Sequence, residues 1–528
     1  MKTVLVESDR YFDSVFLMRI SRDLQALHGV TQAVVSMGTP SNVDSLSRIG
    51  FEDEGLDQIT PNDLIIALDA ETPEAAQAAQ ARLSEWLTAK PEPDLNGEQT
   101  PASMHPSARP TTVPAAVARL PGANLALISV PGEYAAREAR IALREGLHVM
   151  LFSDNVSIED EIALKDEAVH RRLLMMGPDC GTAIINGKPL GFANAVRRGR
   201  IGIVGASGTG IQEISSLVHR LGAGVSQAIG TGGRDLSEPV EGRMTLLGIE
   251  ALAGDSDTDV VVLVSKTPSP AVAKTVLSKL ESCGKPAVVH FVGTDAPLDG
   301  SSVAQAMTLA DTALDACRLS GLDVPDAISV PSIDLASWDP DVSIGPGQRK
   351  LIGLFCGGTL CQEAWAILRS HGIEAKSNVA ADPEWRVHYD EHQPVPGHVL
   401  WDLGDDQFTV GRPHPMIEPS LRSDALQLVV DDPAAAVVLV DVVLGYGAHP
   451  FPAEALSLRV NQARKRLREQ DRSLLVIGSI TGTNRDPQKI DRQRKLLEEA
   501  GVIVAESNAA AALAAAAVIE HWSQGDGE

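Results

Sequence analysis

Short apolar runs recur along the chain, and amphipathic stretches of helical length separate them. Representative runs are KTVLVE at 2–7, NLALISV at 124–130, RIGIVG at 200–205, DVVVLVS at 259–265 and AVVLV at 436–440. Continuous runs rich in Val, Ile and Leu are typical of parallel strands that are buried on both faces. The alternation therefore predicts α/β domains with doubly wound parallel sheets of Rossmann-like and flavodoxin-like type.

The first 89 residues follow a different order of elements. Predicted strands cover 2–7, 33–37 and 63–68, and predicted helices cover 15–27 and 73–89. This order is close to a βαββαβ pattern, so we expect a small α+β ferredoxin-like module at 1–89. Modules of this type often bind small regulators or form dimer contacts, and the residues here indicate no particular ligand.

Two segments that are rich in Pro and lack periodicity divide the chain further. They lie at 90–121 and 321–349 and are predicted to be linkers. Between them, 122–180 is half of a doubly wound nucleotide-type domain, and 181–320 is a further α/β domain. The last α/β domain is predicted at 350–528.

Two strand-to-helix turns share a sequence. The strand at 200–205 leads through small residues into GTGIQE at 208–213, and a strand at 350–354 leads into GTLCQE at 358–363. The first amides of a helix lack internal acceptors, and the helix dipole is positive there, so small residues at this point let an anion approach. If both helices point at one place, a single phosphoryl group lies between two dipoles. The predicted phosphate-binding amides are those of Ser207, Gly208, Thr209, Gly357, Gly358 and Thr359. The alternative is two unrelated turns.

Composition narrows the range of partners. The net charge of −25 disfavours nucleic acid and anionic membranes, and no apolar run reaches the ~18 residues that a membrane span needs. The N-terminal sequence lacks signal-peptide features, and the five cysteines show no CxxC pair or metal-ligand spacing. We therefore expect a reduced, cytoplasmic protein with no metal site, whose anion site creates its own positive potential.

The turns GPDCGT at 177–182 and GTGGRD at 230–235, with RIGIVGASGT between them, carry a family resemblance. Over about 124–295 the chain resembles the α subunit of succinyl-CoA synthetase, and 350–520 resembles the ligase domain of the matching β subunit. In that family, one helix N-terminus from each subunit holds a phosphate, which implies the same for the twin turns. With VPGEYAAREA, CGGTLCQEA and RPHPMIEPSLR, the whole arrangement resembles the FdrA family.

Three departures from the succinyl-CoA synthetase pattern bear on the chemistry. No Gly-rich turn precedes Asn124, so 122–180 resembles a truncated CoA-binding half-domain, and CoA binding is in doubt. The loop that carries the phosphorylated His in the α subunit matches a region with only His290, which we expect to be a core histidine. Lys266 stands where the family has a supporting Glu. Because an ATP-grasp domain is also missing, we expect no phosphorylation from ATP.

Other polar residues near predicted strand ends are candidates for the site. Lys266 could neutralise a phosphate or a carboxylate, or be a surface lysine. The stiff loop RPHPMIEP offers Arg412, His414 and Glu418 as a carboxylate clamp and a general acid or base, or is only a rigid connector. We predict Lys266 and His414 as catalytic. The predicted substrate-binding residues are Gly232, Gly233, Arg412, Glu418, Gly445 and Asn484.

Three functions fit these observations. FdrA-like proteins are implied to act with two partner proteins in carbamoyl transfer, which converts oxalurate and phosphate to oxamate and carbamoyl phosphate in ureide or purine catabolism. The second is an acyl-CoA synthetase of the NDP-forming, succinate–CoA ligase type. The third is a non-catalytic regulatory protein that binds phosphate or a metabolite. We expect a homo-oligomer with other carbamoyltransferase subunits as partners, phosphate or carbamoyl phosphate as substrate, and no firm cofactor.

Overall fold

The computed structural model divides the chain into two compact units, Met1–Arg109 and Pro110–Glu528. It describes residues 2–88 apart from short gaps, 110–294, 301–333, 344–389 without 346, 395–409 and 413–525. Predicted site residue Arg412 lies outside these ranges, as do 90–109 and 334–343 of the predicted linker segments. Within them, every helix is too short or too polar to cross a bilayer.

The N-terminal unit is a small antiparallel sheet with two long helices. Its elements are β1 (Lys2–Glu7), α1 (Ser14–Gln25), β2 (Val30–Met37), β3 (Leu64–Ala70) and α3 (Pro73–Thr88). The strands lie in the order β1-β3-β2, with every neighbouring pair antiparallel. Alternate residues of β2 and β3 meet apolar residues of both helices in one core. The predicted βαββα order is confirmed, and a closing strand does not occur among the described residues.

The second unit begins with a small parallel sheet. Its elements are α4 (Val113–Arg119), β4 (Leu125–Ile128), α5 (Gly132–Arg144), β5 (His148–Leu151), α6 (Ile158–Arg171) and β6 (Met175–Met176), with strand order β4-β5-β6. Helix α4 lies in the predicted linker, which corrects that prediction. Thr112 caps the helix through its side chain, and a proline stands in the first turn, where a missing N–H is tolerated. The proline that suggested a linker therefore starts a helix.

A mixed sheet follows, with a flavodoxin-like strand order. Its elements are β7 (Thr182–Ile185), β8 (Lys188–Gly191), β9 (Arg198–Ala206), α7 (Gly208–Arg220), β10 (Val225–Gly230), α8 (Arg243–Gly254), β11 (Val260–Lys266), α9 (Pro270–Glu281), β12 (Ala287–Val292), β13 (Ala304–Gln305) and α10 (Leu309–Leu319). The order is β13-β12-β11-β9-β10-β7-β8, in which β7 pairs antiparallel with β10 and with β8. The strands from β9 to β13 are parallel, as their apolar runs predict.

The C-terminal sheet repeats this order. Its elements are β14 (Lys350–Phe355), α11 (Gly358–Ser370), β15 (Ala375–Ser377), β16 (His398–Asp402), α12 (Asp406–Thr409), α13 (Ser420–Asp431), β17 (Ala435–Val443), α14 (Pro452–Arg468), β18 (Leu475–Thr481), α15 (Ile490–Glu499), β19 (Ile503–Ala505) and α16 (Asn508–Gly525). The run β19-β18-β17-β14-β16 has the same chain order as β13-β12-β11-β9-β10. In this topology, ligands bind beyond the carboxyl ends of the strands where the order reverses. In the two sheets those ends belong to β9 with β11 and to β14 with β17.

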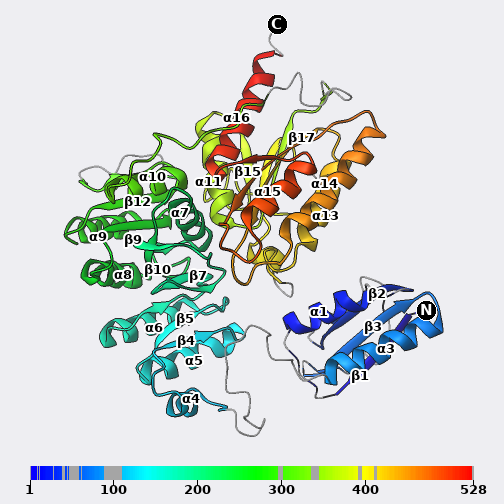
Figure 1. Cartoon of the computed structure of the whole chain (residues 1–528), viewed down its shortest axis with the longest axis horizontal. Helices are drawn as coiled ribbons and strands as arrows, with labels where there is room; N and C mark the ends of the chain where they lie inside the picture. The colour runs from blue at the N-terminus through cyan, green and yellow to red at the C-terminus, as the bar shows by residue number, and fades with distance from the viewer. Residues whose placement is uncertain are drawn as a thin grey trace. The chain divides into compact units, whose positions relative to one another are not determined.

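The two sheets face each other across a shared layer of helices (Figure 1). Apolar residues of α7, α10, α11 and α16 form one core with the inner faces of both sheets. Helices α8 and α9 cover the outer face of the first sheet, and α13, α14 and α15 cover the outer face of the second. The two turns that share a sequence, before α7 and α11, therefore lie in the interface between the domains.

Candidate functional site

The N-termini of α7 and α11 meet. Ser207 caps α7 by accepting the N–H of Gly210 at 3.1 Å, and its Oγ lies 2.7 Å from Thr359 Oγ1 on α11. A Cβ on Gly357 would lie 3.0 Å from the Thr209 methyl group, so small residues are needed at this contact. The predicted convergence of the two helices is present, and the anion that they would bind stays a prediction.

The shared Gln-Glu pairs hold this arrangement in place. Gln212 Nε2 of α7 donates to Leu444 O in the second domain at 3.2 Å, and Gln362 Nε2 of α11 donates to Val292 O in the first at 3.3 Å. Each Gln thus binds the carbonyl of a residue at or after a strand end in the opposite domain. The two bonds thus tie each helix to the opposite domain.

The two glutamates also cross the interface, and both bind Asn508. Glu213 accepts the Asn508 N–H at 3.1 Å at the start of α16, and Glu363 accepts the Asn508 side-chain N–H at 2.7 Å and the Leu309 N–H at 2.7 Å at the start of α10. Burial raises the pKa of Glu213, and it raises the pKa of Glu363 to about 7. These residues position the helices and do not face the turn.

Carboxyl groups surround the N-terminus of α11. Asp441, fully buried on β17, accepts the N–H of Cys356 at 2.7 Å and that of Gly357 at 2.8 Å. Asp402, at the end of β16, places Oδ2 2.4 Å from where a Cβ on Gly358 would be. One of the amides expected to bind an anion at this turn, that of Gly357, thus already has an acceptor.

The N-terminus of α7 has a hydroxyl in the comparable place. Thr182 Oγ1, at the start of β7, lies 3.5 Å from where a Cβ on Gly208 would be. The Thr182 side chain is buried, and its hydroxyl has no hydrogen-bond partner in the described part of the chain. Sequence reasoning missed Thr182, Asp402 and Asp441. For the two aspartates the sequence signal was an acidic residue within or at the end of an apolar strand run, and Thr182 is the last residue of the turn GPDCGT.

Lys266 extends the site from the end of β11, where Ser265 pairs with Ala206 beside the α7 turn. The side chain is exposed and forms no ion pair within the described residues. Burial raises the pKa of Asp402 to about 7, and the positive charge of Lys266 opposes the rise. The Asp179 side chain is exposed, but the protein around it displaces enough water to raise its pKa to about 6. The positive charge of Lys266 opposes this rise as well. Lys266 therefore acts electrostatically on two carboxyl groups whose pKa values are raised.

The turn at 230–235 packs against Asp179. Gly232 has a φ of +87°, and a Cβ there would lie 2.4 Å from Pro178 O. A Cβ on Gly233 would lie 3.6 Å from Asp179 Oδ2. The turn is held by Lys165, a fully buried lysine that pairs with Asp235 at 2.8 Å. The structure thus places Gly232 and Gly233, both predicted to bind substrate, beside residues 178–179. This segment includes Asp179, the carboxyl whose pKa the charge of Lys266 lowers.

His414 lies near Asp402. Its Nδ1 accepts the Met416 N–H at 3.2 Å, so the neutral ring carries its proton on Nε2. Nε2 lies 2.5 Å from where a Cβ on Gly404 would be, and Gly404 donates its N–H to Asp402. Burial lowers the pKa of His414 to about 4. At neutral pH this histidine is an uncharged N–H donor.

The remaining predicted residues have other contacts. Glu418 accepts the N–H of Ser420 at 3.0 Å at the start of α13. A Cβ on Gly445 would lie 2.5 Å from Phe192 O, and Asn484 donates to Asp491 at 2.6 Å in α15. The structure does not bring these side chains to the twin turns, and their predicted substrate roles stay untested. His290 is buried, with Nδ1 3.0 Å from Ala306 O, as expected of a core histidine.

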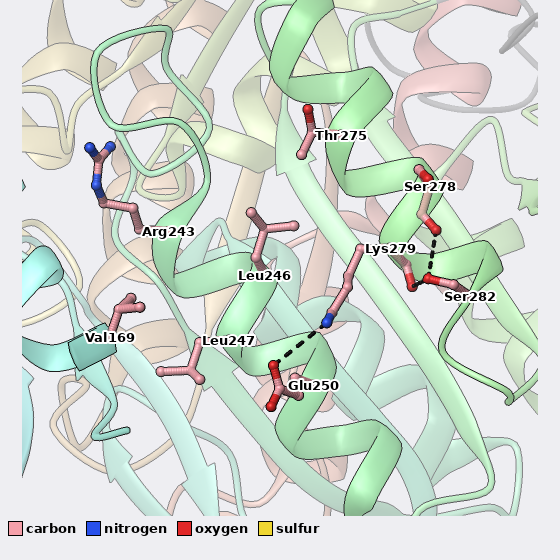
Figure 2. Close-up of a pocket in the computed structure, with 9 residues that line it drawn as sticks. All are labelled: Val169, Arg243, Leu246, Leu247, Glu250, Thr275, Ser278, Lys279 and Ser282. Carbon is pink, nitrogen blue, oxygen red and sulfur yellow. Dashed lines mark hydrogen bonds and ion pairs between the residues drawn. The ribbon is translucent and has the colours of Figure 1, made fainter. Parts of the chain in front are cut away.

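A surface depression lies elsewhere, between α6, α8 and α9. Figure 2 shows its floor, where Lys279 pairs with Glu250 at 3.5 Å. The residues that line it are Val169, Arg243, Leu246, Leu247, Glu250, Thr275, Ser278, Lys279 and Ser282. It contains none of the predicted site residues.

Three family models match the chain. A CoA binding domain matches 196–293, a CoA-ligase domain matches 354–518, and the heavy metal-associated domain of AllF matches 1–103. The chain therefore combines a CoA-binding domain and a CoA-ligase domain, the kinds of domain found in CoA ligases, in one polypeptide. Residues 1–103 contain no cysteine, so this region offers no thiolate ligand, the kind that soft metals favour. Its described residues also contain no cluster of ligands suited to a metal ion.

The chain belongs to the FdrA family, together with the uncharacterized protein YahF of Escherichia coli K12. The two are 42% identical over 513 residues, which is 96% of each chain. Succinate–CoA ligase subunit α of Aquifex aeolicus is 29% identical over 33% of this chain, and the match spans 58% of that subunit. Malate–CoA ligase subunit α of Methylorubrum extorquens is 26% identical over 33% of this chain and 61% of that subunit. Among solved structures, ATP citrate lyase from Methanothrix soehngenii, in complex with citrate and coenzyme A, is 20% identical over 41% of this chain and 38% of that one, with a TM-score of 0.32.

Proposed function

We propose that this chain binds phosphate, or the phosphoryl end of an acyl phosphate, at the meeting point of α7 and α11 and acts in carbamoyl transfer. The observation that carries the proposal is the 2.7 Å contact between Ser207 Oγ and Thr359 Oγ1. It brings the first-turn amides of two helices to one place, and such amides lack intrahelical acceptors. Lys266 adds a positive charge beside them.

The reaction is phosphorolysis of an N-carbamoyl amide, with oxalurate as substrate. A phosphate oxygen attacks the carbamoyl carbon, and the bond from that carbon to the oxamate nitrogen breaks. The leaving nitrogen takes up one proton, so the products are carbamoyl phosphate and oxamate. Helix N-termini and Lys266 stabilise the charge that develops on oxygen. The attacking hydrogen phosphate gives up the proton that the leaving nitrogen takes, and the neutral His414 ring donates a hydrogen bond to the substrate through Nε2–H.

The surroundings of the histidines support phosphorolysis over a phosphohistidine relay. His290 is buried within β12, and its Nδ1 contacts Ala306 O. Burial lowers its pKa to about 4. A phosphorylated residue must reach a nucleotide and then the acyl substrate, and a ring buried within a strand has no path to either.

The test is titration calorimetry of the purified chain with phosphate, carbamoyl phosphate and CoA, followed by an assay for carbamoyl phosphate from oxalurate and phosphate. The assay includes the candidate partner subunits, because the resemblance implies two. Saturable phosphate binding and phosphate-dependent cleavage of oxalurate are expected. If phosphate binds but no combination of subunits cleaves oxalurate, the chain is a phosphate-binding protein. The proposed role in carbamoyl transfer is then overturned.

A second candidate is an acyl-CoA synthetase of the NDP-forming type. The matches to a CoA binding domain over 196–293 and a CoA-ligase domain over 354–518 favour it. It requires a partner to supply the nucleotide site and the phosphorylated histidine. Tight CoA binding with nucleotide-dependent thioester formation would identify this activity in place of carbamoyl transfer.

A further inference from the structure

The two helix N-termini that meet at the site have opposite chemical surroundings. Hydroxyl groups of Thr182 and Ser207 lie at α7. At α11 the Thr359 hydroxyl is joined by the carboxyl group of Asp402, whereas Asp441 is paired with the buried Arg422. A dianionic phosphate is attracted to a helix N-terminus but repelled by carboxylates. The two ends of a bound acyl phosphate are therefore not interchangeable between the helices.

Thr182 marks the end that suits the phosphoryl group. Its hydroxyl is buried, lacks a partner in the described part of the chain, and lies 3.5 Å from the Cβ position of Gly208. A buried hydroxyl without a partner is unfavourable, and most such groups in proteins find one. An anionic oxygen near the Cβ position of Gly208 would supply the missing acceptor. Thr182 Oγ1 is the nearest atom to that position, so the space there is open.

Asp402 marks the other end, and its orientation is fixed. Its backbone N–H donates to Asn378 Oδ1 at 2.9 Å, and its carbonyl accepts from Asn378 Nδ2 at 2.9 Å. Oδ1 accepts the Gly404 N–H at 2.9 Å. Oδ2 lies against Gly358 and has no hydrogen-bond partner within the described residues. Oδ2 of this fixed carboxylate can therefore accept a hydrogen bond from a bound ligand.

We propose that the site is polarised, with the phosphoryl group at α7 bound by the Thr182 hydroxyl and the acyl group at α11 recognised by Asp402 through an N–H. The inference rests on the proposed function and adds which residue binds each end of carbamoyl phosphate and how the site distinguishes a carbamoyl group from other acyl groups. Acetyl phosphate has nearly the same shape but carries a methyl group in place of the NH₂. It leaves Oδ2 of Asp402 without a donor, and a site built for a donor rejects such an analogue strongly.

The experiment measures binding of inorganic phosphate, carbamoyl phosphate and acetyl phosphate to the full chain and to two variants. The unmodified chain is expected to prefer carbamoyl phosphate over acetyl phosphate by about tenfold or more. Asp402→Asn should remove this preference and leave phosphate affinity equal or higher, since the Gly404 N–H holds the amide oxygen and turns the NH₂ toward the ligand. Thr182→Val should weaken all three ligands by a similar factor, about tenfold.

Matched controls separate these effects from charge and folding. Asp405→Asn removes the same charge from the same loop and should keep the carbamoyl preference. Thr182→Ser keeps the hydroxyl and should restore affinity, and thermal unfolding of every variant reports folding.

Three results would count against the proposal. Equal binding of carbamoyl and acetyl phosphate by the unmodified chain, or an Asp402→Asn variant that keeps the preference, overturns the assignment of Asp402 even if phosphate binds. Unchanged phosphate affinity in Thr182→Val overturns the assignment of the α7 end. A chain that binds none of the three ligands overturns the proposed function as well.

Discussion

The hydroxyl groups of Ser207 and Thr359 lie 2.7 Å apart, although 152 positions separate the two residues in the sequence. Each belongs to the first turn region of a helix that follows a buried parallel strand, and the two helices come from different domains. The contact makes one site from two turns of similar sequence. The residues next to the two turns differ, with Thr182 beside Gly208 and Asp402 beside Gly358. Substitutions can therefore test the contribution of each turn separately.

Gly208→Ala and Gly358→Ala are expected to differ in stability. A Cβ on Gly208 meets only Thr182 Oγ1, at 3.5 Å, which is ordinary contact, whereas a Cβ on Gly358 would lie 2.4 Å from Asp402 Oδ2. Gly358→Ala must displace a carboxyl group that Gly404 holds, at a cost of about 1–3 kcal/mol. Thermal unfolding should show a lower Tm for Gly358→Ala alone. Equal Tm values would mean that the Asp402 loop yields without cost.

Gly208→Glu and Gly358→Glu should each abolish phosphate binding, because a carboxylate and its bulk would enter the space in front of a helix N-terminus. Calorimetric titration with phosphate is the measurement. Gly254→Glu, at an exposed position of α8 where an added Cβ meets no other atom within 4 Å, is a control for added charge outside the turns. Unchanged phosphate affinity in both turn variants would rule out a site between α7 and α11.

Anion affinity should fall as pH rises from about 5.5 to 8. The pKa of Asp179 is raised to about 6 and that of Asp402 to about 7, so both carboxyls are neutral at the lower pH and ionised at the upper. The new negative charges repel a bound anion, and we expect a loss of about tenfold. Sulfate is the right probe, because its own charge is constant over this range. Asp402→Asn should flatten the upper part of the profile, and a flat profile in the unmodified chain would contradict the prediction.

Lys266→Met should weaken anion binding and also move its pH dependence. The lysine favours the ionised form of Asp402, so its loss raises the pKa of that carboxyl further above its usual range. Sulfate affinity at pH 6 should drop by roughly tenfold, and the midpoint of the pH profile should move upward. Lys274→Met, on an outer helix of the same domain, is the matched control. A drop in affinity without a moved midpoint would place Lys266 farther from Asp402 than we infer.

The stability of the second unit should decrease between about pH 4.5 and 7 in part through Glu363. Burial raises its pKa from 4.5 to about 7, so the folded state binds a proton that the unfolded state has released. Its contribution is complete below pH 4.5 and is lost as pH rises through 7, a difference on the order of 3 kcal/mol. Glu363→Gln should flatten the dependence of Tm on pH, and an unchanged slope would exclude this group as a cause.

Much of the fold could be predicted from local pattern. The apolar run at 200–205 and the small residues after it define β9 and the start of α7, and the same reasoning locates β14 and α11. Helix α4 was missed because Pro114 suggested a linker, whereas a proline in the first turn is compatible with a helix.

The site was less accessible to prediction than the fold. Thr182, Asp402 and Asp441 come from three segments and become site residues only through strand pairing across the sheets, which no local spacing reveals. The predicted substrate roles of Gly445 and Asn484 stay untested. Both follow strands in Gly-rich sequence, yet their contacts serve packing against Phe192 and the start of α15.

The reciprocal bonds of Gln212 and Gln362 have a consequence for how the site assembles. The proteins related to the first ligase-type domain include subunits named α, whereas here both helices belong to one polypeptide. Joining two modules through a linker fixes their effective concentration at a value that the concentration of protein in solution does not change. The pairing of α7 with α11 therefore survives dilution to nanomolar levels, and any loss of activity on dilution would report departure of another chain.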